Sequence, residues 1–335
     1  MKLLIGIDIG GTNIKLALMD RSARLKAKRI FSTASFKGKD ALIDELVKEI
    51  NSLLSEFHVT KKDLIGIGIG APGAVDIRTG RVHYLTNIPN WREVALGDIL
   101  RKRLKVPVFV DNDVNVMALG ELKAGAGRGA KNMLCITLGT GVGGGLILEG
   151  KLYRGSSYAA GEFGHVPINI GGPKCNCGGR ACVEAYVGNN YIIRDVAARI
   201  KKGEKTLIKK MVNGDLLKIT PEIIDKAARK GDRFAKEVWV RVGNKVGIGL
   251  TGVVNLLNIE KIVIGGGVAE AGKVLFDSIK KTISERAMKL PAKTVKVVKA
   301  KLGYDAGVIG AATLVLYELR NTNHEQRTTR AVGQV

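Results

Sequence analysis

Apolar residues along the chain follow two periods, one typical of buried strands and one typical of amphipathic helices. The short apolar runs that predict strands lie at residues 3–9, 14–19, 64–69, 106–110, 133–138, 142–148 and 262–264. The segments that predict helices are 40–57, 113–124, 190–201, 221–230, 232–257 and 306–319. Strands that alternate with helices in this way are typical of α/β domains. The polar tail, residues 321–335, is expected to be disordered.

Two of the predicted strand pairs are joined by turns that consist mainly of glycine. IGIDIGGTNIKLALMD contains Gly10-Gly11-Thr12-Asn13, and LCITLGTGVGGGLILEG contains Gly139-Thr140-Gly141. Glycine weakens strands, so such runs usually mark a close approach of the backbone to a ligand. The repetition predicts duplicated α/β halves whose turns offer backbone N–H groups to phosphate oxygens. Neither turn is a Walker loop, and Gly10-Gly11 lies in a hairpin rather than before a helix, which excludes a Rossmann fingerprint.

Carboxylates stand at the ends of two predicted strands. Asp8 adjoins the first glycine turn, where a carboxylate beside phosphate requires a divalent cation such as Mg²⁺; the alternative is a turn-stabilising Asp. Asp111-Asn112-Asp113 ends a strand and opens a helix, so one of the three could be an N-cap. Ligands of open α/β sheets bind at such strand ends. An Asp there can accept a proton from a hydroxyl that attacks phosphorus, and Asp113 is the expected catalytic residue.

A short segment gathers residues that bind zinc. It contains His165, Cys175, Cys177 and Cys182, although the whole chain has only four histidines and four cysteines. Three thiolates and one imidazole are the ligands of a closed, tetrahedral zinc site. The alternative is a reactive thiol cluster or a disulfide. Glu162 and Glu184 lie in the same segment and are expected to hydrogen-bond another group.

Composition limits the possible partners of the protein. The 335 residues are enough for two domains, and the net charge is +23. The positive charges are spread over predicted helix faces without a helix-turn-helix, which favours a solvated surface over a nucleic-acid site; polyphosphate stays open as an acidic substrate. No apolar run reaches the roughly 18 residues of a membrane span. Met1-Lys2-Leu3 leads into the first strand, so no signal peptide is expected, and the few cysteines fit the cytoplasm.

Taken together, these segments resemble the bacterial glucokinases of the repressor–open reading frame–kinase (ROK) family. The matching segments are DIGGTNIKLA from Asp8, GAPGAVD from Gly70, LTNIPNW ending at Trp91, VDNDVNVMALGE from Val110, TLGTGVGGGLILEGKLYRG from Thr137, AAGEFGH followed by CNCGGRACVEAY, GGG at 265–267 and DAGVIGAA from Asp305. The resemblance covers the chain except its tail. Two departures lie near the site: Ala181 stands where the family usually has glycine, and Val114 where it has alanine.

The resemblance implies a duplicated actin-like ATPase (ribonuclease H-like) fold, with two α/β domains closing over a central cleft. The expected small domain comprises residues 1–115 and 305–320, and the expected large domain comprises residues 116–304 with the zinc-binding segment.

The resemblance also implies a role for each candidate residue. Asp113 would be the general base toward the sugar 6-hydroxyl. The implied sugar-binding residues are Gly73, Asn87, Asn112, Asp113, Glu162, His165 and Glu184. The implied ATP-binding residues are Asp8, Gly10, Gly11, Thr12, Asn13, Lys15, Gly139, Thr140 and Gly141 for the phosphates, with Gly265, Gly266 and Gly267 beside the adenosine. Zinc on His165 and the three cysteines would position the sugar-binding side chains without taking part in the chemistry.

The predicted protein is therefore a cytoplasmic ATP-dependent glucokinase that uses Mg²⁺ and structural Zn²⁺. The resemblance suggests a homodimer, and no membrane or nucleic-acid partner is expected. One alternative is a kinase for another hexose (mannose, fructose or an N-acyl hexosamine) or one that uses polyphosphate. A sugar-responsive transcriptional regulator is disfavoured, because such family members carry an N-terminal helix-turn-helix and this chain begins at the first glycine hairpin.

Overall fold

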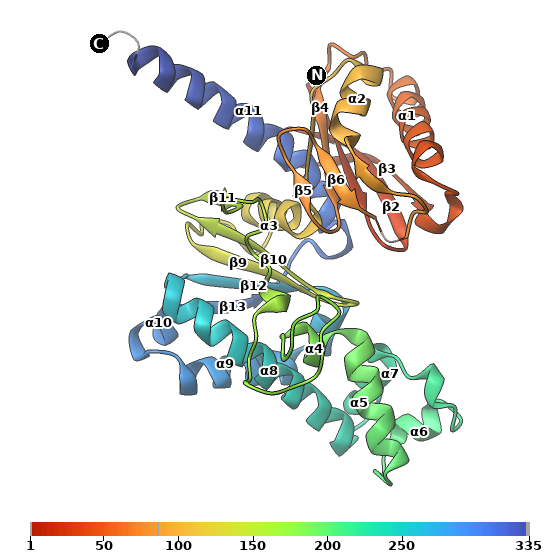
Figure 1. Ribbon diagram of the computed structural model, residues 1–335, viewed down its shortest axis with the longest axis vertical. Coiled ribbons are helices and arrows are strands. Elements are labelled where there is room, and N and C mark those ends of the chain that lie inside the picture. The colour runs from red at the N-terminus through yellow and green to blue at the C-terminus, as the bar shows by residue number, and fades with distance from the viewer. Residues whose placement is uncertain (1, 86, 333–335) are drawn as a thin grey trace. The chain divides into compact units, whose positions relative to one another are not determined.

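The chain folds into two compact α/β units. The computed structural model describes residues 2–85 and 87–332, with residues 323–332 described by their backbone alone (Figure 1). Unit 1 comprises Met1–Arg128, Arg154–Ala160 and Lys301–Val335. Unit 2 comprises Gly129–Tyr153 and Gly161–Ala300. Among the described residues, no helix combines the length and apolar character that crossing a membrane requires.

The sheet of unit 1 has the strand order β3-β2-β1-β4-β8. β1 (Leu3–Ile9), β2 (Asn13–Asp20) and β3 (Leu25–Ser32) pair antiparallel. β4 (Leu64–Ala71) runs parallel to β1, and β8 (Val108–Asn112) runs parallel to β4. A smaller antiparallel sheet consists of β5 (Val75–Asp76), β6 (Arg81–Tyr84) and β7 (Arg92–Val94). The carboxyl ends of β1, β4 and β8 therefore lie along one edge of the sheet.

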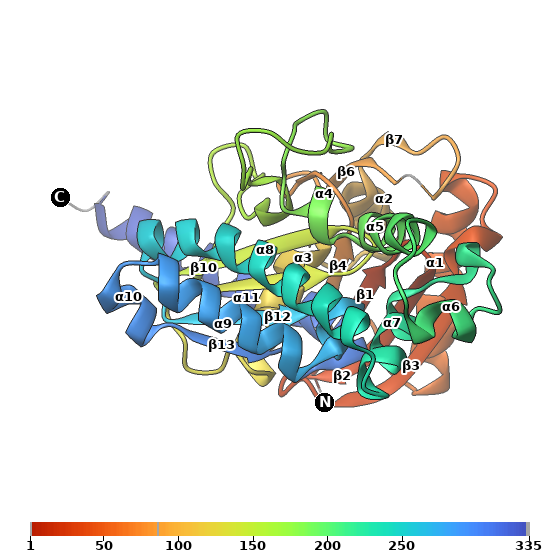
Figure 2. The same ribbon diagram turned by 90° about the horizontal axis from the view of Figure 1, so that it is seen from below.

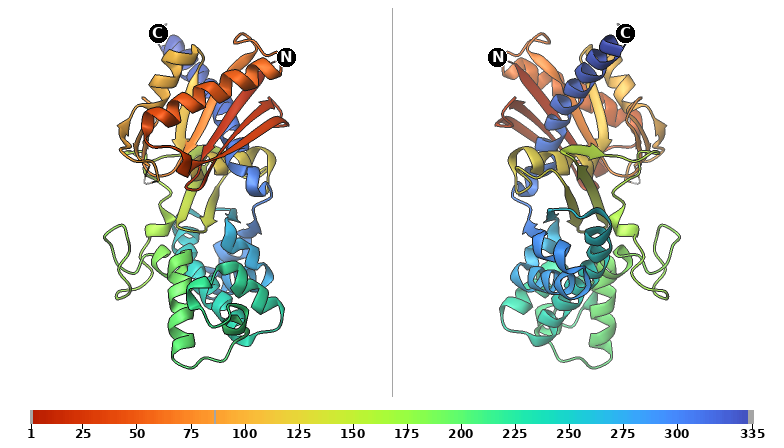
Figure 3. Two further views of the ribbon diagram at one scale, coloured as in Figure 1. Left: turned by 90° about the vertical axis from the view of Figure 1, so that its right-hand side faces the viewer. Right: turned by 90° about the vertical axis from the view of Figure 1, so that its left-hand side faces the viewer.

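Helices cover both faces of this sheet. α1 (Lys39–Glu56) and α2 (Leu96–Leu104) lie on one face, and α11 (Ala306–Val332) lies on the other (Figure 3). α3 (Asp113–Ala124) packs against α11. The alternation of β1 explains this arrangement, because its odd-numbered residues share a core with α1 and α2 while Leu4 packs against α11.

Glycines on the second face let α11 approach the sheet at backbone distance. A Cβ atom on Gly68 of β4 would lie 1.7 Å from the carbonyl oxygen of Ala311. The same atom on Gly6 of β1 would lie 2.0 Å from the carbonyl oxygen of Val308. The alternating glycines of β4 are therefore a packing surface for a helix.

Unit 2 repeats the topology of unit 1. Its sheet has the order β11-β10-β9-β12-β13, again an antiparallel trio followed by two parallel strands. The strands are β9 (Met133–Leu138), β10 (Val142–Leu148), β11 (Lys151–Tyr153), β12 (Lys261–Gly265) and β13 (Lys296–Lys299). The duplication that the two glycine turns predicted is thus present at the level of whole sheets.

The helices of unit 2 bury one face of its sheet. They are α4 (Glu184–Val187), α5 (Asn189–Lys201), α6 (Leu207–Met211), α7 (Pro221–Arg229), α8 (Arg233–Leu257), α9 (Lys273–Arg286) and α10 (Lys289–Thr294). α8 and α9 run side by side (Figure 2), and Gly243 and Gly247 of α8 meet Ser278 and Thr282 of α9. Short 3-10 turns occur at Thr33–Ser35, Phe163–His165, Leu216–Lys218, Gly267–Ala271 and Gly303–Asp305.

The observed boundaries differ from the expected ones in the placement of α3, of residues 154–160 and 301–304, and of the tail. Residues 154–160 and 301–304 were expected in the large domain and belong to unit 1. α3 belongs to unit 1 as a whole, because a Cβ atom on Gly310 of α11 would lie 1.8 Å from the carbonyl oxygen of Val116, which locks the two helices together. α11 continues to Val332, so residues 321–332 are helical rather than disordered. The Glu, Gln and Arg residues that make this tail polar are also good helix formers. Residues 333–335 of the expected tail lie outside the described residues.

The close contact between Gly68 of β4 and α11 predicts an effect on stability. We expect Gly68→Ala to lower the free energy of unfolding by about 1–3 kcal/mol or more, because α11 has to move away from the sheet. Urea unfolding followed by circular dichroism measures the change. Gly252→Ala is the matched control, since Gly252 lies in α8 with nothing within 4 Å of the added Cβ; it should gain about 0.5–1 kcal/mol. Wild-type stability of Gly68→Ala would contradict this account of the packing.

Candidate active site

The first glycine turn joins β1 to β2 and is supported through its carbonyl groups. The amide of Gly10 donates to the carbonyl oxygen of Asn13 at 3.0 Å, and the Thr33 hydroxyl donates to the carbonyl oxygen of Gly10 at 2.8 Å. The Asn87 amide nitrogen donates to the carbonyl oxygen of Gly11 at 2.6 Å. Within the part of the chain that the structure describes, the amides of Gly11 and Thr12 remain as donors for a ligand.

Asp8 and Lys15 form a pair beside this turn. Lys15 Nζ lies 3.0 Å from Asp8 Oδ2, and both side chains are largely buried. The same ammonium group lies 3.8 Å from the centre of the Tyr304 ring. The Asp8 carboxylate also packs against the start of α11, where a Cβ atom on Gly307 would meet it at 2.4 Å. Asp8 is thus held between a cation and a helix N-terminus, and its carboxylate is partly neutralised.

Asn112 and Asp113 lie where β8 becomes α3. Asn112 is the N-cap: its Oδ1 accepts from the amides of Val114 at 2.9 Å and Asn115 at 3.3 Å. Its Nδ2 donates to the carbonyl oxygen of Gly73 at 3.1 Å. Asp113 is the first helical residue and is half-buried, with Oδ1 accepting from the Val114 amide at 2.9 Å. The three candidate sugar-binding residues Gly73, Asn112 and Asp113 therefore form one local cluster.

Asp111, directly before them, is buried and paired with Arg154. Arg154 Nε donates to Asp111 Oδ2 at 2.7 Å, and the same guanidinium pairs with Glu318 of α11. Burial by itself lowers the pKa of Arg154, but the two carboxylates outweigh it and raise that pKa above its ordinary value. Neither Arg154 nor Glu318 stands out in the sequence, because only the fold brings these residues to Asp111.

The second glycine turn, in unit 2, is held by Glu184. Glu184 Oε2 accepts from the amide of Val142 at 2.9 Å, and a Cβ atom on Gly141 would lie 2.8 Å from that oxygen. The amide of Asn189 donates to the carbonyl oxygen of Gly139 at 2.9 Å. The junction between α4 and α5 thus packs on the turn. Glu184 is engaged with the turn as well as being a candidate for sugar binding.

The third glycine run lies next to the second turn. Gly266 has a φ of +87°, and a Cβ atom there would lie 2.3 Å from the carbonyl oxygen of Leu138 at the end of β9. β12, which ends at Gly265, pairs parallel with β9. The structure therefore brings Gly265–Gly267 and Gly139–Gly141 to one edge of the unit 2 sheet.

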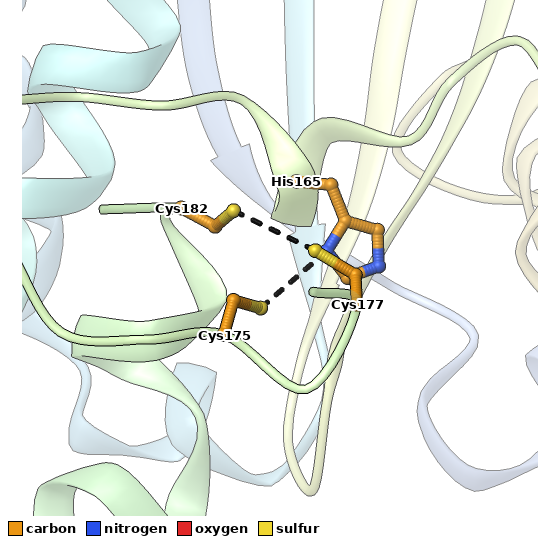
Figure 4. Close-up of side chains that lie close together, drawn as sticks. All are labelled: His165, Cys175, Cys177 and Cys182. Atoms are coloured by element: carbon orange, nitrogen blue, oxygen red, sulfur yellow. Dashed lines mark hydrogen bonds between the residues drawn. The ribbon is translucent and has the colours of Figure 1, made fainter. Parts of the chain in front are cut away.

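His165, Cys175, Cys177 and Cys182 converge on one point (Figure 4). Their ligand atoms all lie within 4.8 Å of one another. Cys177 Sγ lies 3.8 Å from Cys182 Sγ, and Cys175 Sγ lies 3.8 Å from His165 Nδ1. A tetrahedral zinc with bonds of about 2.3 Å to sulfur places its sulfur ligands about 3.8 Å apart, so the residues fit this ion.

The electrostatics of the cluster also call for a cation. Burial raises the pKa of Cys182 to about 12 and raises that of Cys175. A hydrogen bond from the Gly179 amide and the neighbouring Cys175 thiol lower the pKa of Cys177. Three adjacent thiolates repel one another, and a bound divalent cation is the charge that lets all three ionise.

Local geometry links the cluster to the candidate sugar residues of unit 2. With Nδ1 of His165 toward Cys175, Nε2 lies 3.9 Å from Glu162 Oε2. Glu184 Oε1 lies 3.9 Å from Cys175 Sγ. Ala181 has a left-handed φ of +57°, a conformation that glycine adopts without strain.

A polar hollow of about 440 Å³ adjoins the second turn and contains residues that sequence analysis missed. It is lined by Thr140, Asn176, Glu184, Asn190, Tyr191, Ile193 and Arg194. The missed side chains are an amide pair, a phenol and a guanidinium, which suit a nucleotide or sugar. In the sequence, these residues could have been found from Gly188-Asn189-Asn190 at the start of α5, because the N-terminus of a helix can bind an anionic ligand.

Comparisons with known proteins agree with these features. The ROK family matches residues 4–318. The glucokinase of Halalkalibacterium halodurans is 39% identical over 93% of this chain and 94% of its own. A ROK family glucokinase from Streptomyces griseus, solved in complex with glucose and AMPPNP, superposes with a TM-score of 0.78 and 32% identity over 93% of this chain and 98% of that one. The xylose repressor of Caldicellulosiruptor bescii is 29% identical over 94% of this chain and 78% of its own.

These matches confirm the expected fold class and family. The solved neighbours include ROK kinases with the actin-like ATPase fold, and the duplicated mixed sheets of this chain have that fold. The match spans both glycine turns, the Asn112-Asp113 corner and the His/Cys cluster. The chain therefore belongs to the ROK family, as an ATP-dependent sugar kinase.

Proposed function

We propose that this protein is a glucokinase, which transfers the γ-phosphoryl group of ATP to the 6-hydroxyl of glucose. The observation that carries the proposal is the corner at Asn112 and Asp113. There a half-buried carboxylate opens α3 at the carboxyl end of β8, next to the Gly73 turn. The Halalkalibacterium relative is a glucokinase, and the Streptomyces structure holds glucose with AMPPNP, an ATP analogue. Glucose and ATP are accordingly the first substrates to test.

Asp113 acts as the general base. As the sugar 6-oxygen attacks the γ-phosphorus, Asp113 accepts its proton, the bond from the γ-phosphorus to the β–γ bridging oxygen breaks, and ADP leaves. Phosphoryl transfer passes through a loose transition state, so the gain comes from positioning and from neutralising charge. The rigid N-cap at Asn112 suits this need. We also assign sugar binding to Asn112, Gly73 and Asn87, which lie in unit 1, and to Glu162, His165 and Glu184, which lie in unit 2.

The glycine turns would bind the ATP phosphates. Amides of Gly11 and Thr12 are available in the first turn, and the second turn lies beside Gly265–Gly267 for the adenosine. Asn13 and Lys15 flank the first turn, and Lys15 can move from Asp8 to a phosphate. Asp8 is a carboxylate of the kind that holds Mg²⁺ through water and phosphate oxygens. Bound Mg²⁺ would offset the negative charge of the polyphosphate chain.

The His/Cys cluster would hold structural zinc, because its ligand set and spacing fit the ion. When bound, zinc supplies a fixed point that orients the nearby side chains. Nε2 of His165 would then face the sugar while Nδ1 is a ligand, and Glu184 would be held between the cluster and the second turn. Thiolate ligands also favour a reducing compartment, so we place the enzyme in the cytoplasm.

Two alternatives rest on specific observations. The net charge of +23 would attract polyphosphate as a phosphoryl donor, and a kinase for another hexose stays an alternative. The similarity to a xylose repressor keeps a regulatory role open. A gel-shift titration at several salt concentrations separates the latter, since phosphate contacts give a steep salt dependence. A homodimer and the lack of a nucleic-acid partner stay predictions.

The substrate assignment predicts a clear preference in a steady-state assay. With Mg-ATP and a panel of hexoses, kcat/KM should be highest for glucose, and polyphosphate run in parallel should be the poorer donor. A preference for another sugar would keep the mechanism and replace the substrate. No activity on any sugar in zinc-loaded protein would overturn the kinase proposal.

The general-base assignment predicts that Asp113→Asn lowers kcat by about 10²–10⁴-fold, because the amide cannot accept the proton. Glucose binding, measured by isothermal titration calorimetry, should change much less. Asp44→Asn is the control, since Asp44 pairs with Arg103 on the surface and should leave kcat unchanged. Near-normal turnover of Asp113→Asn would remove Asp113 from this role.

The zinc proposal predicts that Cys175→Ser loses the metal. Wild-type protein should contain about one zinc per chain by elemental analysis, and the variant almost none. Its kcat should fall by about tenfold or more through disorder of the sugar-binding side chains. Cys135→Ala is the control, because Cys135 is buried in β9 outside the cluster and should keep its zinc. An active, zinc-free Cys175→Ser protein would contradict the proposal that zinc positions the sugar-binding side chains.

A further inference from the structure

The chain makes a brief return to unit 1 between two parts of unit 2. β11 ends at Tyr153, Arg154–Ala160 belongs to unit 1, and Gly161 resumes unit 2. The return begins with Arg154, and the amide of Ala160 donates to the Arg154 carbonyl oxygen at 2.9 Å. This hydrogen bond therefore joins the first and last residues of the segment, Arg154 and Ala160.

The Arg154 side chain is buried between two carboxylates from other parts of unit 1. It is 12% exposed, against 2% for Asp111 and 21% for Glu318. The guanidinium pairs with Asp111 from β8 and Glu318 from α11, and the Tyr317 ring lies 5.6 Å from its central carbon. A planar guanidinium holds two carboxylates in fixed directions, which a lysine cannot do.

Asp111 transmits this constraint to the catalytic corner. Its Oδ1 accepts from the amide of Asn112 at 2.7 Å and from Nδ2 of Asn115 at 2.8 Å. Its Oδ2 is the atom bound by Arg154. One carboxylate therefore connects the guanidinium to the backbone immediately before Asp113 and to the first turn of α3.

We propose that Arg154 is a positioning residue for phosphoryl transfer, which holds the Asn112–Asp113 corner in place through Asp111. This inference rests on the proposed role of Asp113.

Stability alone does not account for the arrangement. Buried ion pairs cost desolvation energy, and apolar groups of similar volume often serve stability equally well. Arg154 instead fixes the orientation of two carboxylates, because its planar guanidinium binds Asp111 of β8 and Glu318 of α11 together. Phosphoryl transfer is sensitive to direction, since a displacement of about 1 Å at the reacting groups can cost about 10²-fold in rate.

Arg154→Met tests the proposal, because methionine keeps much of the volume and removes the fork. We expect kcat at saturating glucose and ATP to fall by about 10–100-fold. The KM for ATP should stay within about twofold, since the residue touches neither glycine turn. Arg29→Met is the matched control: Arg29 also bridges two carboxylates, Glu49 and Glu56, but between β3 and α1, and its loss should leave kcat unchanged.

A double-mutant cycle separates positioning from a general loss of structure. If Arg154 acts through Asp113, Arg154→Met should cause no further loss of kcat in an Asp113→Asn background. Losses that multiply in the double variant would overturn the proposal, as would wild-type kcat in the single variant. Normal turnover of Asp113→Asn alone would instead defeat the proposed general base, so the two failures are distinguishable.

Glu318→Gln carries the test if Arg154→Met does not fold. It keeps Asp111 and Arg154 together but weakens the second arm of the fork at a half-buried position. A drop in kcat at unchanged KM for ATP supports the inference. Wild-type kcat in folded Glu318→Gln protein counts against it.

Discussion

Helix α11 can lie close to the sheet of unit 1 because glycines stand at key positions of the strands that face it. Gly6 and Gly68 bring β1 and β4 into backbone contact with the helix. Gly310 of α11 in turn receives the backbone of α3. The close approach has a functional consequence, because the helix that packs on the sheet also fixes α3, whose first residue is Asp113. The start of α11 also meets the Asp8 carboxylate beside the first glycine turn.

Carboxylates that accept hydrogen bonds from backbone amides fix connecting segments in both units. Glu121 of α3 is fully buried and accepts hydrogen bonds from the amides of Ala126, Lys301 and Leu302, close to where the chain leaves unit 1 and returns to it. Glu184 holds the second glycine turn in the same way. Hydrogen bonds to a charged acceptor are stronger than neutral ones, and a buried acceptor without them would be costly. The second glycine turn is therefore held in a defined position although glycine itself permits many backbone conformations.

Local pattern predicted the elements whose residues carry a strong period. The bounds of β1, α3, β9 and β10 agree with the expected segments. β3 was missed, since LKAKRIFS is partly exposed along its length and carries basic residues that weaken the apolar alternation. The glycines of β4 show that residue type alone does not identify the group that approaches the backbone. A close backbone approach was foreseeable for glycine, but the partner of Gly68 is a helix rather than a ligand.

Three features could be predicted from local sequence alone: the duplicated strand–glycine–strand pattern, the His/Cys ligand set and the position of Asp113 at the start of a helix. Each of these depends on residues close together in the chain, where spacing and residue type carry the information. The distant partners that hold the turns and the Asn112–Asp113 corner in place follow from the fold instead. Asp111 meets Arg154 across 43 positions, Asn87 meets Gly11 across 76, and Glu184 meets Val142 across 42. Such pairs form only when packed strands and helices bring distant segments together, so the local periodicity around one residue does not reveal its partner.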